Sequence, residues 1–369
     1  MGDFQLQRLG LVMEPEPGNP LEGEGVLNPG AARGPDGQLY FFPRLVARGN
    51  YSRIGIARVL FNDVGDPDGV ERLGIALEPE ADYEQREDGS GGCEDPRITF
   101  IEPLRRYVMT YTAHSSNGPR IALAVSEDLF RWERLGLATF RPYDGIEFEG
   151  VDNKDASVFP IAVPDPSGQP SMAILQRPLF PGTRPEETAC RSGSRLVDLH
   201  LESIWISYCS TAMPDCEWCH LRHFGSHHRL AIPVAPWERL KIGGGTPPVL
   251  TRHGWLTIYH GVSELSASSG SAPALCYSAG VLVLSEEFPQ VIRYRSPEPV
   301  LTPELSAERQ GIVDNVVFPT AIDRRDDLGS PDCFDVYYGM ADKRIGVARL
   351  EVPERLPAGG LADPPQAKV

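Results

Sequence analysis

The stretch CEDPRITF, residues 93–100, has two acids, a proline and an arginine after its initial cysteine and ends in β-branched and aromatic residues, which is typical of a short β-strand. A glycine-rich turn, DGSGG (88–92), precedes it. Four other segments also place polar or turn residues ahead of a short apolar run: LNPGAAR (27–33), NKDASVFP (153–160), GGGTPPVLT (243–251) and DNVVFPTAI (314–322). We call these five segments lead strands.

Two further apolar runs follow each lead strand, in the same order every time. The pairs are 39–47 with 52–60, 107–113 with 119–136, 171–178 with 203–211, 255–262 with 274–284, and 334–342 with 343–352. They mostly alternate apolar and polar residues between turn residues, as strands with one buried face do. Asn28 to Asp95 and Arg53 to Arg120 both span 67 residues, which indicates a true repeat.

Five repeats of small antiparallel sheets predict an all-β fold, a five-bladed β-propeller. We expect one domain, residues 1–369, with a core of about 27–352 and extensions at both ends. The alternative is a β-sandwich whose strands resemble one another by coincidence. In a propeller the lead strands line the central channel, so Asn28, Asp95, Lys154, Thr246 and Asn315 are expected to converge there.

Composition narrows the class of partner. The formal net charge of -16 disfavours nucleic acid and anionic membranes as partners. No run of 18 apolar residues is present, and the first 20 residues lack the apolar centre of a signal peptide. Seven irregularly spaced cysteines suit free thiols in a reducing compartment, so we expect a cytoplasmic protein.

The motifs NPGA, EDPRIT, NKDA, KIGGGTPPV, YHGV, NVVFP and YYGMADKRIGVA resemble, in this order, those of glycoside hydrolase family 130, the five-bladed β-mannoside phosphorylases and mannosidases. The resemblance extends from Asn28 to Leu350. It implies an inverting reaction in which inorganic phosphate, the only co-substrate, takes the mannosyl group from a β-mannoside and yields α-mannose 1-phosphate. It implies no cofactor and no metal.

The resemblance also assigns roles to residues. Asp95 matches the general acid, whose proton is thought to pass through the 3-hydroxyl of the sugar. The expected mannoside-binding residues are Asn28, Arg44, Asp155 and Asp342. The expected phosphate-binding residues are Lys154, Arg177, Lys241, His260 and Tyr277. Glu94 is expected to point away from Asp95 along an alternating strand and to be structural. Gln176 stands where many relatives have histidine, which suggests an altered acceptor subsite.

Two other functions remain open. An inverting hydrolase of the same family needs a second carboxylate as base, with room for water between the two acids, and lacks the cationic phosphate set. A sugar-binding propeller without catalysis has no need for an acid facing several cations. The sequence leaves the linkage, the acceptor sugar and the oligomeric state undetermined, although relatives often associate.

The segment DCEWCHLRHFGSHH (215–228) offers a further alternative. Cys216 and Cys219 have the spacing of a zinc site, with His223, His227 and His228 nearby. The competing interpretation is a variable loop whose cysteines and histidines share no ligand.

Overall fold

The computed structural model of the chain describes residues 3–181, 199–210, 219–265 and 274–361, and these residues form β-strands with only short helical segments. The helical segments are η1 (Pro20–Glu22), η2 (Asp82–Glu84), η3 (Glu102–Leu104), η4 (Cys219–Arg222), η5 (Pro236–Glu238), α2 (Ser306–Arg309) and η6 (Asp326–Leu328). None of the helices in these ranges is long and apolar enough to cross a membrane.

The strands fall into five groups, numbered here by the order of their lead strands. Group 1 holds β2 (Gly25–Arg33), β3 (Leu39–Ala47), β4 (Tyr51–Phe61) and β5 (Pro67–Leu77), and group 2 holds β6 (Gly91–Ile101), β7 (Arg106–Ser115), β8 (Gly118–Ser126) and β9 (Glu133–Leu137). Group 3 holds β10 (Thr139–Phe140), β11 (Asp152–Val158), β12 (Val163–Pro164), β13 (Pro170–Leu179), β14 (Ile204–Ser210) and β15 (His223–Ala231).

Group 4 holds β16 (Lys241–Gly243), β17 (Val249–Thr251), β18 (Gly254–Glu264), β19 (Leu275–Leu284) and β20 (Ile292–Arg295). Group 5 holds β21 (Val317–Arg324), β22 (Cys333–Met340), β23 (Arg344–Glu351) and, from the other end of the chain, β1 (Gln5–Met13). The predicted lead strand 243–251 is therefore interrupted between β16 and β17, where Pro247 and Pro248 cannot donate ladder hydrogen bonds.

Groups 1 and 2 are joined into one eight-stranded sheet by a short parallel pairing of β4 with β6. Ser52 pairs with Gly92, and a Cβ at Gly92 would lie 2.2 Å from the Ser52 carbonyl oxygen. Only glycine permits this approach, and its φ of 113° suits glycine as well. The glycines before CEDPRITF thus set the junction between the two groups.

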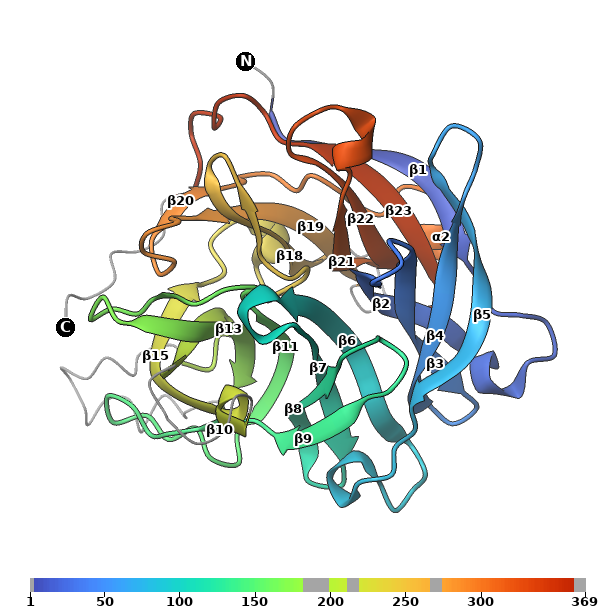
Figure 1. Cartoon of the computed structure of the whole chain (residues 1–369), viewed down its shortest axis with the longest axis horizontal. Helices are drawn as coiled ribbons and strands as arrows, with labels where there is room; N and C mark the ends of the chain where they lie inside the picture. Colours follow the sequence, from blue (N-terminus) through green and yellow to red (C-terminus); the bar gives the residue numbers. More distant parts are fainter. Residues whose placement is uncertain (1–2, 182–198, 211–218, 266–273, 362–369) are drawn as a thin grey trace.

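The lead strands follow one another around a common centre (Figure 1). β6 contacts both β2 and β11, and β21 contacts β2, so the last group returns to the first. Thr320 closes this contact by donating its hydroxyl to the Pro29 carbonyl oxygen at 2.7 Å. The interrupted lead segment of group 4 fits between its neighbours, because a Cβ at Gly244 or Gly245 would lie 2.8–2.9 Å from backbone oxygens of Asp155 or Pro319.

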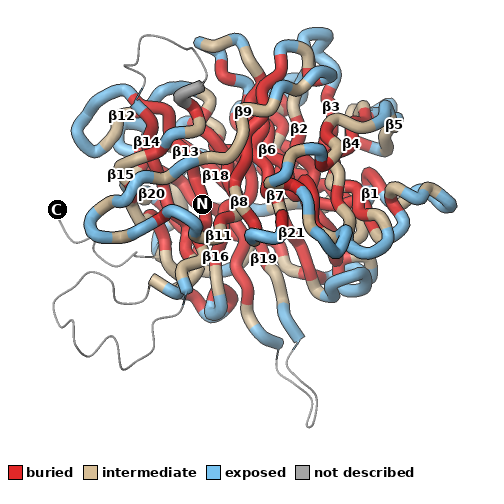
Figure 2. The backbone as a smooth tube through the Cα atoms, turned by 90° about the horizontal axis from the view of Figure 1, so that it is seen from below, coloured by how far each residue is buried: buried red, intermediate tan, exposed pale blue. Residues whose placement is uncertain are grey.

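The apolar core is divided among these interfaces. Five clusters of buried side chains each join two neighbouring groups, and one of them joins group 5 to group 1. Phe41 of β3, for example, packs edge-on against Tyr337 of β22 with their ring centroids 4.7 Å apart. Figure 2 shows this buried interior with exposed residues gathered at the turns.

Among the described residues, four of the groups carry the same ion pair between a buried glutamate and an arginine, which we call the Glu–Arg clamp. A glutamate from the helical turn before the lead strand binds an arginine on the outermost strand. The pairs are Glu22–Arg72, Glu84–Arg134, Glu238–Arg295 and Glu308–Arg8, with N–O distances of 2.7–2.9 Å. In three of them a tyrosine of the second strand, Tyr111, Tyr259 or Tyr338, also donates to the glutamate. Because Arg8 lies on β1, the clamp of group 5 also anchors the N-terminal strand.

Candidate active site

The lead strands of the first three groups contain a bulge at the same place. The pairing register shifts after Leu27 in β2, after Glu94 in β6 and after Lys154 in β11. The next residues, Asn28, Asp95 and Asp155, have φ of 45°, 48° and 57°. Asn and Asp tolerate this left-handed conformation better than other non-glycine residues, and a bulge re-aims the side chain it carries. Local backbone geometry therefore favours the residue types found at these three positions.

Asp95, the predicted acid, sits at the centre of a polar cluster. Its Oδ1 accepts hydrogen bonds from Asn28 Nδ2 at 2.9 Å and from Arg44 Nη1 at 3.3 Å. The Asp95 side chain is 11% exposed, so it is close to fully buried yet retains contact with solvent. The structure thus brings Asp95 together with two of the residues expected to bind the mannosyl unit.

The orientation predicted for Glu94 is wrong. Arg44 binds Glu94 through Nη2 at 3.0 Å while its Nη1 reaches Asp95, so both carboxylates face the same guanidinium. The bulge breaks the strict alternation that the prediction assumed. Glu94 also contacts Lys154 Nζ at 3.4 Å and His114 Nδ1 at 3.2 Å. Burial alone would raise the pKa of the Glu94 carboxyl, but the charge of Arg44 and the other partners hold it well below its usual range.

Asp342, the fourth residue predicted to hold the sugar, lies beside this cluster after β22. Burial raises its pKa to about 6, the negative charge of Asp95 adds to the effect, and Arg44 opposes it. A carboxyl with such a pKa loses its proton in the range where many enzymes work. The cluster therefore holds three carboxyl groups, and the carboxyl of Asp342 is poised to change charge at a pH of about 6.

We expect Asp342→Asn to raise the melting temperature at pH 7.5 and to have a smaller effect at pH 4. The pKa of Asp342 is higher in the folded chain than its ordinary 3.8, so the folded state binds this proton more tightly. Its contribution to stability is therefore lost as the pH rises to about 6. Asparagine removes that loss. Thermal unfolding at both pH values measures the difference, with exposed Asp63→Asn as control; an equal shift at both would contradict the assignment.

The five predicted phosphate-binding residues also come together, from groups 3 and 4. Arg177 on β13 and His260 on β18 both contact Asp155, at 2.5 Å and 3.7 Å. Lys241 Nζ lies 5.6 Å from the ring centroid of Tyr277, and Lys154 joins the set to Asp95's cluster through Glu94. We call these five residues the cation cluster, after the three basic side chains among them, Lys154, Arg177 and Lys241.

Asp155 occupies the interior of the cation cluster. Its side chain is 2% exposed and also faces Arg97 Nη2 at 3.8 Å. Burial alone would raise its pKa, but the charges of Arg177 and its other neighbours bring it well below the usual range. A Cβ at Gly243 would lie 2.3 Å from Asp155 Oδ2, so β16 presses directly on this carboxylate. These contacts favour a role in holding the cations rather than the sugar contact that the sequence suggested.

Burial also changes the two titratable donors of group 4. It lowers the pKa of His260 to about 3, and Arg177 adds to this effect against the opposing charge of Asp155. His260 is therefore neutral at pH 7, and neither ring nitrogen has a hydrogen-bond partner among the described residues. Burial lowers the pKa of Lys241 to about 8, with the charge of Arg177 in the same direction. Unpaired buried polar atoms beside cations are suited to bind an anion.

Two residues singled out from the sequence, Gln176 and Thr246, are buried and bonded outside the two clusters. Gln176 is fully buried; it receives a hydrogen bond from Asn153 and donates to Ser207 Oγ at 2.6 Å, so its amide is used inside group 3. Thr246 is buried as well, and its hydroxyl accepts from the Ile258 backbone at 3.0 Å. The lead-strand residue Asn315 contacts the cation cluster through its carbonyl oxygen, which accepts a hydrogen bond from Tyr277 N at 3.0 Å.

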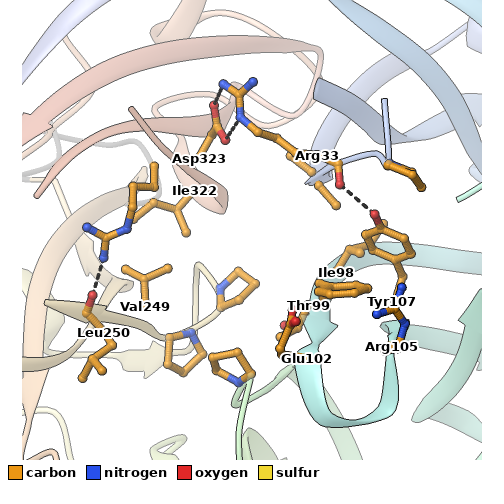
Figure 3. Close-up of a pocket in the computed structure, with 18 of the residues that line it drawn as sticks. Arg33, Ile98, Thr99, Glu102, Arg105, Tyr107, Val249, Leu250, Ile322 and Asp323 are labelled. Atoms are coloured by element: carbon orange, nitrogen blue, oxygen red, sulfur yellow. Dashed lines mark hydrogen bonds and ion pairs between the residues drawn. The ribbon is translucent and has the colours of Figure 1, made fainter. Parts of the chain in front are cut away.

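A separate cavity of about 900 Å³ lies at the other ends of the lead strands (Figure 3). Arg33 and Asp323 form a two-point ion pair on its wall, and Tyr107 donates to the Arg33 carbonyl oxygen at 2.9 Å. Arg97, which precedes Ile98 of the cavity lining, is buried and donates hydrogen bonds to the carbonyl oxygens of Asp95 and Gly245. The predicted catalytic and phosphate residues all lie outside this cavity's lining.

The proposed zinc ligand Cys216 lies outside the described residues. His227 bonds Ser207 Oγ and the Arg141 carbonyl oxygen, and His228 bonds Ser226 Oγ. Within the described part of the chain, no three His, Cys, Asp or Glu side chains are grouped to hold a metal ion.

Comparison with known proteins places these features in context. Residues 11–356 match the profile of the family Glyco_hydro_130, described as beta-1,4-mannooligosaccharide phosphorylase. A 1,2-beta-oligomannan phosphorylase and a beta-1,2-mannobiose phosphorylase, both from Thermoanaerobacter sp., are 31% and 30% identical over 71% and 70% of this chain and 69% and 67% of their own lengths. The Listeria innocua beta-1,2-mannobiose phosphorylase structure superposes with a TM-score of 0.65 at 22% identity, covering 93% of this chain and 96% of that one.

Proposed function

The chain belongs to glycoside hydrolase family 130, and on that premise we propose that it is an inverting phosphorylase of β-mannosides that produces α-mannose 1-phosphate. The curated relatives are named as phosphorylases of β-mannosides. We also propose that the five strand groups are the blades of a single five-bladed propeller whose channel carries the site. The cyclic contacts of the lead strands and the five core clusters between groups support this arrangement.

One observation gives the proposal its main support: the carboxylates of Asp95 and Glu94 lie beside the cation cluster, and Glu94 contacts residues of both sets. Asp95 and Glu94 share Arg44 on one side, and Glu94 contacts Lys154 on the other. A reaction between a neutral sugar and phosphate needs an acid at the glycosidic oxygen and several donors that hold the anion in line with the anomeric carbon. The chain has a net charge of -16, so a local gathering of basic side chains such as the cation cluster is best explained by a bound anion.

The proposed reaction assigns one task to each cluster. Asn28, Arg44 and Asp342 hold the mannosyl unit against Asp95, which gives its proton through the 3-hydroxyl to the leaving oxygen. The cation cluster holds phosphate on the opposite face of the ring, where one of its oxygens attacks the anomeric carbon. The glycosidic C–O bond breaks as the new C–O bond forms, so the configuration inverts and the acceptor sugar leaves protonated.

The first test is product formation from a panel of β-mannosides with and without inorganic phosphate. We expect mannose 1-phosphate only when phosphate is present. Free mannose at equal rates in both conditions would mean hydrolysis, and the absence of turnover on every linkage would favour a sugar-binding protein.

Lys241→Met provides the matched variant for this test. We expect the KM for phosphate to rise at least tenfold, since a hydrogen bond to a charged group contributes about 1.5–3 kcal/mol, while the KM for the mannoside stays nearly constant. Because the pKa of Lys241 is about 8, the wild-type affinity for phosphate should also fall above that pH as the ammonium loses its proton. Equal KM changes for both substrates would remove Lys241 from the phosphate site.

A further inference from the structure

We propose that Glu202 occupies the outer face of Arg177 in the resting enzyme and that phosphate displaces it on binding. This inference rests on the proposed phosphorylase function. Glu202 lies just before β14, and its carboxylate forms an ion pair with Arg177 Nη1. Asp155 holds Nε of the same guanidinium at 2.5 Å, so two carboxylates satisfy Arg177 at once. An anion approaching Arg177 must replace one of them or remain outside both.

Burial decides which carboxylate gives way. Asp155 is 2% exposed, has Arg97 and His260 as further partners, and is pressed by the backbone at Gly243. If the Asp155 carboxylate moved away, it would lose several contacts and would leave buried cationic side chains without its negative charge. The Glu202 side chain is 27% exposed, and Arg177 is its only ion-pair partner among the described residues. Water can therefore solvate Glu202 when it swings away.

The other resting contact of a predicted phosphate-binding cation differs from this one. Lys154 contacts Glu94, but Glu94 is 2% exposed and is bound by Arg44 and His114 as well. Glu94 is therefore a fixed positioning residue. Glu202 alone among these carboxylates combines partial exposure with a single charged partner, so it acts as a removable internal competitor for the anion. Its backbone stays in place, because the Glu202 carbonyl oxygen accepts a hydrogen bond from Ile242 N at 3.1 Å.

Glu202→Gln is expected to lower the KM for phosphate, which is the opposite of the effect expected from removing a cation. A partly exposed ion pair is weak. Its loss therefore raises by only a few fold the fraction of molecules in which Arg177 Nη1 is open to an anion. Removing a negative charge next to the incoming anion adds to the gain. We expect a KM for phosphate about three- to tenfold lower, with the KM for the mannoside unchanged. Glu202→Ala should change it in the same direction.

Glu264→Gln is the control, because Glu264 is a partly exposed glutamate of group 4 that pairs with Arg239 rather than Arg177. It removes the same charge without freeing Arg177, so its KM for phosphate should stay near the wild-type value. A KM that is unchanged or raised in both Glu202 variants would overturn the inference, provided that the wild-type enzyme shows phosphate-dependent turnover. A wild type without such turnover would instead refute the proposed function, which keeps the two failures distinct.

Discussion

Asp95→Asn is expected to lower kcat for phosphorolysis of a β-mannoside by about a thousandfold, within the range that general acid catalysis supplies. Asparagine tolerates the left-handed conformation that residue 95 adopts, with its φ of 48°. Its amide oxygen can still accept from Asn28 and Arg44, as the Asp95 carboxylate does. The variant therefore loses the proton and keeps the shape. Steady-state kinetics at saturating phosphate and mannoside measures the loss.

A mannoside with an activated aryl leaving group separates acid catalysis from binding. Such a leaving group departs without protonation, so Asp95→Asn should lose much less activity on it than on a disaccharide. Asp63→Asn, on an exposed turn, should match the wild type on both substrates. If Asp95→Asn kept more than a tenth of the wild-type kcat on the disaccharide, Asp95 would not be the acid.

Glu238→Gln is expected to destabilise the fold by about 3 kcal/mol, since removing one partner of a fully buried ion pair is strongly destabilising. Glu238 and Arg295 are both 0% exposed and lie 2.7 Å apart. Glutamine can still accept from Tyr259, but it lacks the negative charge that Glu238 places beside the guanidinium. Against a typical total stability of about 5–15 kcal/mol, this loss is large. The midpoint of urea unfolding, with the slope held constant, measures it.

Glu264→Gln again gives the matched control. Its ion pair with Arg239 is largely exposed, and such pairs contribute about 0–1 kcal/mol. A loss below about 1 kcal/mol in Glu238→Gln, equal to that of the control, would show that the clamp contributes little. A clear difference would identify the Glu–Arg clamps as anchors of the outermost strands in the four groups that carry them.

The alternation of apolar and polar residues predicts the buried strands but not the outermost ones. The apolar runs 39–47 and 255–262 correspond to β3 and β18, because both are largely buried and bounded by turns. β5 was missed because most of its residues are partly or fully exposed, so its pattern is weak. β1 was missed for a different reason: Gln5 pairs with Glu351, and no local signal announces a partner at the other end of the chain.

Local sequence patterns were enough to predict the lead strands, except for the interruption in group 4, and their repetition along the chain. These features depend on local propensities: alternation, turn residues, and the tolerance of Asn and Asp for a left-handed bulge. The family resemblance of the EDPRIT motif around Asp95 could be recognised because that motif is also a local pattern. It predicted a phosphorolytic chemistry without placing any two groups in contact.

The partners of the polar side chains, in contrast, depend on how the strand groups pack together. Glu94 turned toward Arg44, and Asp155 became enclosed by the cations. Glu202, which drew no attention in the sequence, was brought onto Arg177. Each of these contacts joins strands or connections whose distance is set by packing, so no local pattern predicts it. A one-residue bulge or a few ångströms of approach decides whether a carboxylate meets a cation, and neither is encoded in the period of a single strand.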